Sequence, residues 1–257
     1  MIKESLYFTY NGRKSSDFGI VNVSIQSGLF QESLLASRSI VETSVRGNPK
    51  PYFSEIKREP ITIPLTFYFE ETWNDELIDE ICDWLDVEYY QQLGFDENFD
   101  RIFYALPVDG LDLIHNGLKQ GYVTLNMRTN SPYAYSHIIE NAFDFTQNDG
   151  VNTFTIRNKG RLEIKPVLEI TKVDAGNIRI VNYSKANSEF FLKNLGNGEI
   201  ITINCEKRYI DSSFDISRYD DFNQNYLSLP FGINNLQVTG KCYLKMRYYY
   251  TYKALTV

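Results

Sequence analysis

Long apolar runs are missing from this sequence of 257 residues. No stretch approaches the roughly 18 to 20 apolar residues of a membrane-spanning helix, so the sequence argues against a membrane protein. The first ten residues, MIKESLYFTY, also lack the basic start and apolar core of a secretory signal peptide. We therefore expect a soluble product that is made in the cytoplasm and is not exported.

Cysteine and histidine are scarce. Cys82, Cys205 and Cys242 stand far apart, and neither His115 nor His137 has a Cys, His or carboxylate at the spacing of a metal site. Isolated cysteines in odd number indicate a reducing compartment and not a disulfide framework. The sequence predicts no metal site and no cofactor, and it gives both histidines ordinary roles.

Signatures of catalysis are also missing. Asp17, Phe18 and Gly19 match the magnesium-binding triplet of kinases. The glycine-rich loop, the ATP-binding lysine and the catalytic-loop motif of kinases do not accompany them. The carboxylates around Asp79 and Asp83 would suit a glycosidase only across a cleft, whereas on one helix they share a water-facing surface. The chain has no nucleophile elbow and no phosphate-binding loop. We predict that the protein is not an enzyme and has no catalytic residues.

Positive charge is in deficit, because 26 Lys and Arg oppose 33 Asp and Glu and leave a net charge of −7. This balance argues against stable nucleic-acid binding and against binding to anionic membranes. Aromatic residues, in contrast, make up 15% of the chain, with 19 Tyr and 17 Phe. Since aromatic residues favour strands, the composition indicates a mainly β fold.

Alternation of apolar and polar residues predicts strands through most of the first half. Asn11 and Gly12 mark a tight hairpin, because both central residues of a type I′ turn need positive φ. The alternation after this turn continues through Ile25 and Leu29. One helix is predicted, over residues 73–86, where the apolar positions form a single stripe.

Details of the same half follow from turn and capping residues. Thr72 or Asn74 is expected to cap the helix, and its Trp84 to lie in the core. A strand over residues 101–106 is expected to close at Pro107, before a turn. Residues 121–136 read as the last strand of a first domain, which stops at a proline because proline lacks an N–H.

Residues 34–59 have a different composition, with charges of both signs among β-branched residues and a Gly/Pro-rich centre at 47–51. They predict a long β-hairpin arm that projects from the first domain, although a surface loop is the alternative. An isolated two-stranded ribbon is only marginally stable, so the arm is expected to pair with a partner. The predicted interface residues are Arg38, Val41, Val45, Arg46, Tyr52, Phe53, Ile56 and Arg58.

The pattern starts again after residue 138. Short apolar segments follow at roughly 10-residue intervals with Gly/Asn turns between them, including segments at 214–216 and 226–229. This spacing is typical of a β-sandwich. We predict a β-sandwich-like first domain over 1–138 and a β-sandwich over 139–257, and leave open which of them holds the closing strand at 241–251.

Several segments together resemble one protein family. They are SSDFGI near the start, SPYAYS at the end of the first domain, and then NKGRLEIKPVLEI, GEIITINCEKRYI and LPFGINNLQVTG. In order and spacing this sequence is similar to the distal tail proteins (Dit) of long-tailed, non-contractile bacteriophages. The resemblance covers essentially the whole chain and implies a galectin-like second sandwich.

This resemblance also implies a role. It implies a homo-hexameric ring at the phage tail tip or baseplate, with the arm as a belt between neighbours, in a virion made in the bacterial host. The tail tube protein and a tail-associated fibre- or lysin-type protein would be axial partners, with receptor-binding proteins as further candidates. The alternative is a carbohydrate-binding protein that presents Tyr219, Phe222, Tyr226 or Phe231 to cell-wall polysaccharide.

Overall fold

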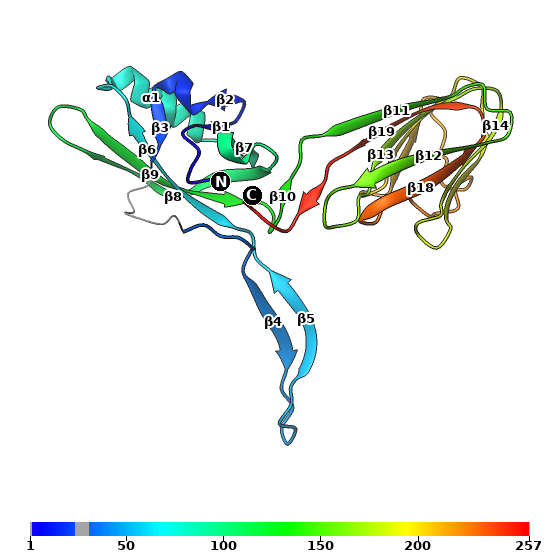
Figure 1. Ribbon diagram of the computed structural model, residues 1–257, viewed down its shortest axis with the longest axis horizontal. Coiled ribbons are helices and arrows are strands. Elements are labelled where there is room, and N and C mark those ends of the chain that lie inside the picture. The colour runs from blue at the N-terminus through cyan, green and yellow to red at the C-terminus, as the bar shows by residue number, and fades with distance from the viewer. Residues whose placement is uncertain (1, 24–30, 257) are drawn as a thin grey trace. The chain divides into compact units, whose positions relative to one another are not determined.

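A computed structural model describes residues 2–23 and 31–256, and the alternation predicted through Ile25 and Leu29 lies outside these ranges. Contacts divide the chain into two units (Figure 1). Unit 1 consists of Met1–Tyr135 and Tyr252–Val257, and unit 2 of Ser136–Thr251. Residues 252–256 thus lie with unit 1. That residues 1–138 and 139–257 fold as two independent domains stays a prediction.

Unit 1 is built on a nine-stranded sheet whose main path runs β2-β1-β7-β8-β9-β6-β3, with β10 and β20 off this path. Its strands are β1 (Phe8–Tyr10), β2 (Arg13–Lys14), β3 (Ile20–Asn22), β6 (Thr62–Phe69), β7 (Gln91–Phe95), β8 (Ile102–His115), β9 (Gly121–Thr129), β10 (Ala134–Tyr135) and β20 (Thr251–Tyr252). Short 3-10 helices span Ser15–Phe18 and Asp96–Asn98. The rings of Phe8 on β1 and Phe67 on β6 lie 6.3 Å apart although three strands separate β1 from β6 in the sheet. The sheet therefore folds over on itself like a sandwich.

The predicted helix is α1 (Asp75–Leu85). Asn74 is its cap, because the Asn74 side chain accepts a hydrogen bond of 2.8 Å from the Leu77 N–H. Trp84 on its buried face is 4% exposed, and the indole N–H donates to the Tyr10 carbonyl at 2.8 Å. The core position predicted for Trp84 is confirmed, and this bond ties α1 to β1.

The turns of unit 1 agree with the prediction in one place and differ in another. Asn11 and Gly12 have φ of 46° and 75°, so the tight hairpin between β1 and β2 is confirmed. The end predicted for the strand at 101–106 is wrong, because β8 continues past Pro107. Asp109 has a φ of 65° within a bulge between Val108 and Asp112, beyond which β8 pairs with β9 again.

Strands β4 (Arg38–Thr43) and β5 (Tyr52–Arg58) form a separate two-stranded sheet, drawn in blue and cyan in Figure 1. The hairpin arm predicted for residues 34–59 is therefore confirmed, and the surface-loop alternative is wrong. We refer to residues 34–59 as the arm.

Unit 2 contains a five-stranded sheet, β11-β19-β13-β16-β17, and a four-stranded sheet, β12-β18-β14-β15. The strands are β11 (Ile139–Phe145), β12 (Val151–Asn158), β13 (Val167–Lys172), β14 (Gly176–Asn182), β15 (Ser188–Leu195), β16 (Ile200–Asn204), β17 (Tyr209–Ser212), β18 (Gly232–Thr239) and β19 (Cys242–Tyr248). Buried side chains of both sheets share one core, which confirms the β-sandwich. The closing strand β19 belongs to this sandwich.

Two strands predicted in unit 2, at 214–216 and 226–229, are wrong, because residues 213–231 form a loop. The alternation that suggested them has another cause. Phe222, Leu227 and Leu229 enter the sandwich core, whereas Phe214 and Ile216 stay exposed. We refer to residues 213–231 as the closing loop.

Candidate assembly surface

Both faces of the arm are open to solvent. Every residue of β4 and β5 is exposed, and Ile40 and Phe53 reach 65% and 63%. Burying a large apolar side chain contributes about 1.5 to 3 kcal/mol, and an isolated ribbon has no core of its own. The arm thus has a strong physical reason to associate with another surface.

The register divides the arm side chains between two faces. Ile40 lies opposite Ile56 and Glu42 opposite Phe53, with a bulge between Val41 and Glu42. Opposed residues share a face and successive residues alternate. One face carries the three large apolar residues Ile40, Phe53 and Ile56, after which we call it the apolar arm face. Arg38, Glu42 and Arg58 lie on the same face. The other, here the polar arm face, carries Ser39, Val41, Thr43, Tyr52, Glu55 and Lys57.

All eight predicted interface residues are exposed, but they do not gather on one face. The apolar arm face holds Arg38, Phe53, Ile56 and Arg58; the polar arm face holds Val41 and Tyr52; and the connection between the strands holds Val45 and Arg46. Ile40 is missing from the predicted set. Ile40 could have been identified from its pairing with Ile56. The sequence does not reveal that pairing, because the bulge between Val41 and Glu42 shifts the register.

The arm also carries unbalanced charge. It has five Lys and Arg against three Glu, while the whole chain has a net charge of −7. Arg38 lies directly opposite Arg58, an arrangement that destabilises an isolated ribbon. A surface that receives the apolar arm face would relieve this repulsion if it supplied carboxylates.

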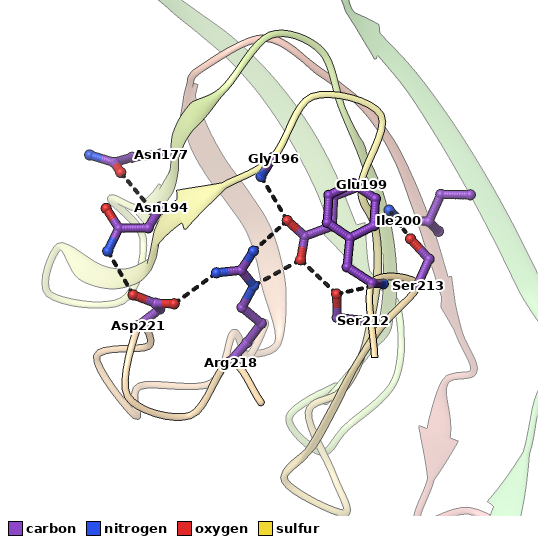
Figure 2. Close-up of polar contacts among 10 residues, drawn as sticks. Asn177, Asn194, Gly196, Glu199, Ile200, Ser212, Ser213, Arg218 and Asp221 are labelled. Atoms are coloured by element: carbon purple, nitrogen blue, oxygen red, sulfur yellow. Dashed lines mark hydrogen bonds and ion pairs between the residues drawn. The ribbon is translucent and has the colours of Figure 1, made fainter. Parts of the chain in front are cut away.

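A second cluster of charged side chains lies inside unit 2, at the closing loop (Figure 2). Arg218 donates through Nε and Nη2 to both oxygens of Glu199, at 2.8 and 2.7 Å, and through Nη1 to Asp221 at 2.8 Å. The Ser212 hydroxyl and the Gly196 N–H also donate to Glu199, at 2.6 and 2.7 Å. The Glu199 side chain is fully buried and every polar atom has a partner. We call this the Glu199 network and assign it a structural role.

The network changes the acidity of its members. Burial alone would raise the pKa of Glu199, but hydrogen bonds from Arg218, Ser212 and the Gly196 N–H outweigh burial and hold that pKa below its usual value. The contribution of Glu199 to stability is therefore present above the unfolded-state pKa of about 4.3 and is lost as the pH falls through the lower folded-state pKa.

We expect unit 2 to lose stability below about pH 4.3, with a smaller loss in a Glu199→Gln variant. Urea unfolding followed by far-UV circular dichroism from pH 7 to pH 3 would measure this slope. Trp73 and Trp84 both lie in unit 1, so tryptophan fluorescence reports that unit separately. Glu189→Gln, at an exposed ion pair, is the matched control. Equal slopes for all three proteins would contradict the role of Glu199.

The buried cysteines and His115 occupy structural positions. Burial raises the pKa of the Cys205 thiol to about 12 and that of the Cys242 thiol to about 11, so both stay protonated near neutral pH. The His115 ring packs edge-on against Trp73 at 5.8 Å. Within residues 2–23 and 31–256, no three potential metal ligands come together, and no helix is long and apolar enough to cross a membrane.

The four aromatic residues considered for sugar binding do not form one platform. Phe222 is buried in the core, 5.1 Å from the Phe190 ring, and Tyr226 packs against Phe222 at 4.8 Å. Only Tyr219 and Phe231 of the four are exposed. The assignment of Phe222 to a sugar-facing surface is therefore wrong.

Two families match the chain in succession. The first, described as a phage tail protein N-terminal domain, matches residues 3–131, and the second, a phage tail C-terminal domain, matches residues 133–248. The SPbeta prophage-derived protein YomH of Bacillus subtilis strain 168 is 35% identical over 254 residues, which cover 98% of this chain and all of YomH. The chain belongs to the phage tail protein family.

Solved structures share the fold of this phage tail protein. The SPP1 Dit protein, described as a paradigm of the hub adsorption apparatus in phages that infect Gram-positive bacteria, superimposes with a TM-score of 0.69 at 10% identity, over 95% of this chain and 98% of Dit. A chain of the phage P2 baseplate in its activated, calcium-bound conformation gives 0.52 at 10% identity, over 98% and 99% of the two chains. The resemblance to distal tail proteins and the mainly β fold class are confirmed.

Proposed function

We propose that this phage tail protein is a structural hub of the tail tip. Six copies form a ring that joins the tail tube protein to the baseplate or fibre proteins, and the arm makes the belt between neighbours. The protein acts by assembly and not by catalysis. The observation that carries this proposal is the arm, with both faces exposed on a chain whose fold is shared with a phage hub protein.

The arm suits a ring because its contact is heterologous. The arm of one copy would meet a different surface on the next, and such head-to-tail contacts close into a ring when the rotation allows. Backbone pairing and burial of the apolar arm face would supply most of the association energy, since exposed ion pairs contribute only about 0 to 1 kcal/mol each.

The placement at the tail tip is tested by immunolabelling of phage particles that carry this chain. Antibodies raised against the purified protein should label the end of the tail distal to the capsid, and should block attachment of baseplate components. Labelling along the whole tail, labelling at the capsid, or absence of the chain from purified particles would contradict the hub.

A sugar-binding function for unit 2 has weaker support, because Phe222 lies in the core and only Tyr219 and Phe231 of the four candidate aromatics are exposed. A glycan array probed with the full chain would detect such binding.

A further inference from the structure

The two open sides of the unit 2 sandwich are treated differently. The side bordered by β15 and β17 is covered by the closing loop. The Asn223 N–H donates to the Phe191 carbonyl at 3.1 Å, and the Ile210 N–H donates to the Tyr219 hydroxyl at 3.2 Å. The Glu199 network holds this loop in place (Figure 2). The outer backbone groups of β15 are therefore largely occupied, and β17 is only four residues long.

The opposite side, bordered by β11 and β12, is covered at one end, where the Arg161 N–H just beyond β12 donates to the Thr251 carbonyl at 2.8 Å. β12 pairs with β18 through all eight residues, from Val151 to Asn158, without a register shift. Its outer backbone receives one hydrogen bond from a described residue, from the Tyr250 hydroxyl to the Arg157 carbonyl at 3.0 Å. In an antiparallel ladder alternate residues turn both backbone groups outward. Since Arg157 does so, Thr153 and Thr155 are expected to do so too.

The outer edge of β12 lacks the usual protection. Natural proteins blunt long edges with proline, bulges or several charges, whereas the β12 sequence, VNTFTIRN, has no proline and one charged residue. Its Val, Thr, Phe and Ile residues favour strands. An edge of this kind is a template for strand addition by another polypeptide.

The surroundings of this edge favour one kind of partner. On the exposed side, Ile233 lies opposite Arg157 and is 59% exposed, and Phe231 nearby is 57% exposed. The Arg161 guanidinium lies 4.8 Å from the centre of the Phe231 ring. Arg157 and Lys159 are exposed and form no ion pair with any described residue. This local excess of cations stands out in a chain with a net charge of −7.

We propose that the outer edge of β12 receives an extended segment of another tail protein. The segment adds as a strand beside Val151–Thr155, places apolar side chains next to Val151, and extends acidic residues toward Arg157 and Lys159. That the partner is a tail protein rests on the proposed function. A second copy fits less well, because two identical edges pair about a two-fold axis, which a ring of copies facing the same way does not provide.

Peptide selection on the full-length protein tests this inference. A displayed library of random 12-residue peptides would be selected on the immobilised chain, and one enriched peptide synthesised for titration. We expect enriched peptides to alternate β-branched or apolar residues and to carry Asp or Glu in one half. Hydrogen exchange should show that the bound peptide slows the amides of β12.

Three variants give the decisive comparison. Thr153→Pro should weaken binding at least tenfold, because it removes an outward N–H, while Thr153→Val keeps the backbone and should bind normally. Should Thr153→Pro fail to fold, the surface variant Arg157→Glu with Lys159→Glu remains, and it should also weaken binding about tenfold. No enrichment, equal binding by all variants, or a dimer lost only in Thr153→Pro would overturn the inference. The ring is assessed separately, by the mass of the same samples.

Discussion

Replacing residues 44–53 with a short Gly/Ser turn should convert a six-copy ring into folded monomers. The replacement removes Tyr52 and Phe53, and with them two of the six residue pairs between β4 and β5 and the whole tip of the arm. No residue of the replaced segment lies in the core of unit 1, so the fold should survive. Native mass spectrometry at matched concentrations would measure the change, with the intact protein giving six times the mass of one chain.

The control for this replacement is a second exposed hairpin. Replacing residues 116–120, between β8 and β9, with the same Gly/Ser turn shortens a comparable loop and should leave the ring intact. Point variants sharpen the test. Ile40→Lys puts a charge on the apolar arm face and should weaken the ring, while Val41→Lys, opposite Glu55 on the polar arm face, should not. A shortened arm that still supports rings would show that the arm is only a surface hairpin.

Arg218→Ala should destabilise unit 2 by about 3 to 5 kcal/mol, the usual result of removing one partner from a buried ion pair. The loss is large because Glu199 would stay fully buried without its two guanidinium hydrogen bonds, and the closing loop would lose its anchor. Urea unfolding at pH 7, followed by circular dichroism, would measure the change. Tryptophan fluorescence should change little, because both tryptophans lie in unit 1.

The matched control removes an exposed pair from the same unit. Arg179 and Glu189 form an ion pair of 2.6 Å with about half of the Arg179 side chain exposed, and such pairs contribute about 0 to 1 kcal/mol. Arg179→Ala should therefore shift the urea midpoint far less than Arg218→Ala. A similar shift for both variants would mean that the Glu199 network adds no more than a surface contact.

Features specified by neighbouring residues are predictable from the sequence, and features specified across the chain are not. Asn11 and Gly12 determine their own turn, and the capping side chain of Asn74 acts within one helical turn. The alternating residues of 213–231 follow the same local rule, which therefore predicts strands where the structure has a loop. Arg218 pairs with Glu199, 19 positions away, and this contact anchors a loop that the local pattern does not reveal.

The candidate site shows the same division. Gly/Pro residues between two β-branched segments identify the arm and its exposure, but not its faces. The bulge between Val41 and Glu42 moves Phe53 to the side of Ile40, and no local signal marks it. The sequence does not predict the exposed edge of β12 for another reason. A strand is an edge strand because it lacks a neighbour on one side in the folded sheet.

The course of the chain between the units makes unit 2 an insertion within unit 1. The chain leaves unit 1 after β10 and returns through β20, and these two strands pair with each other. The Ser136 N–H also donates to the Tyr250 carbonyl at 2.9 Å, so the two ends of the insert are held side by side. An inserted domain whose two ends lie close together can be replaced by another domain without disturbing the host domain. The sandwich can therefore be exchanged as one cassette while the sheet of unit 1 stays complete.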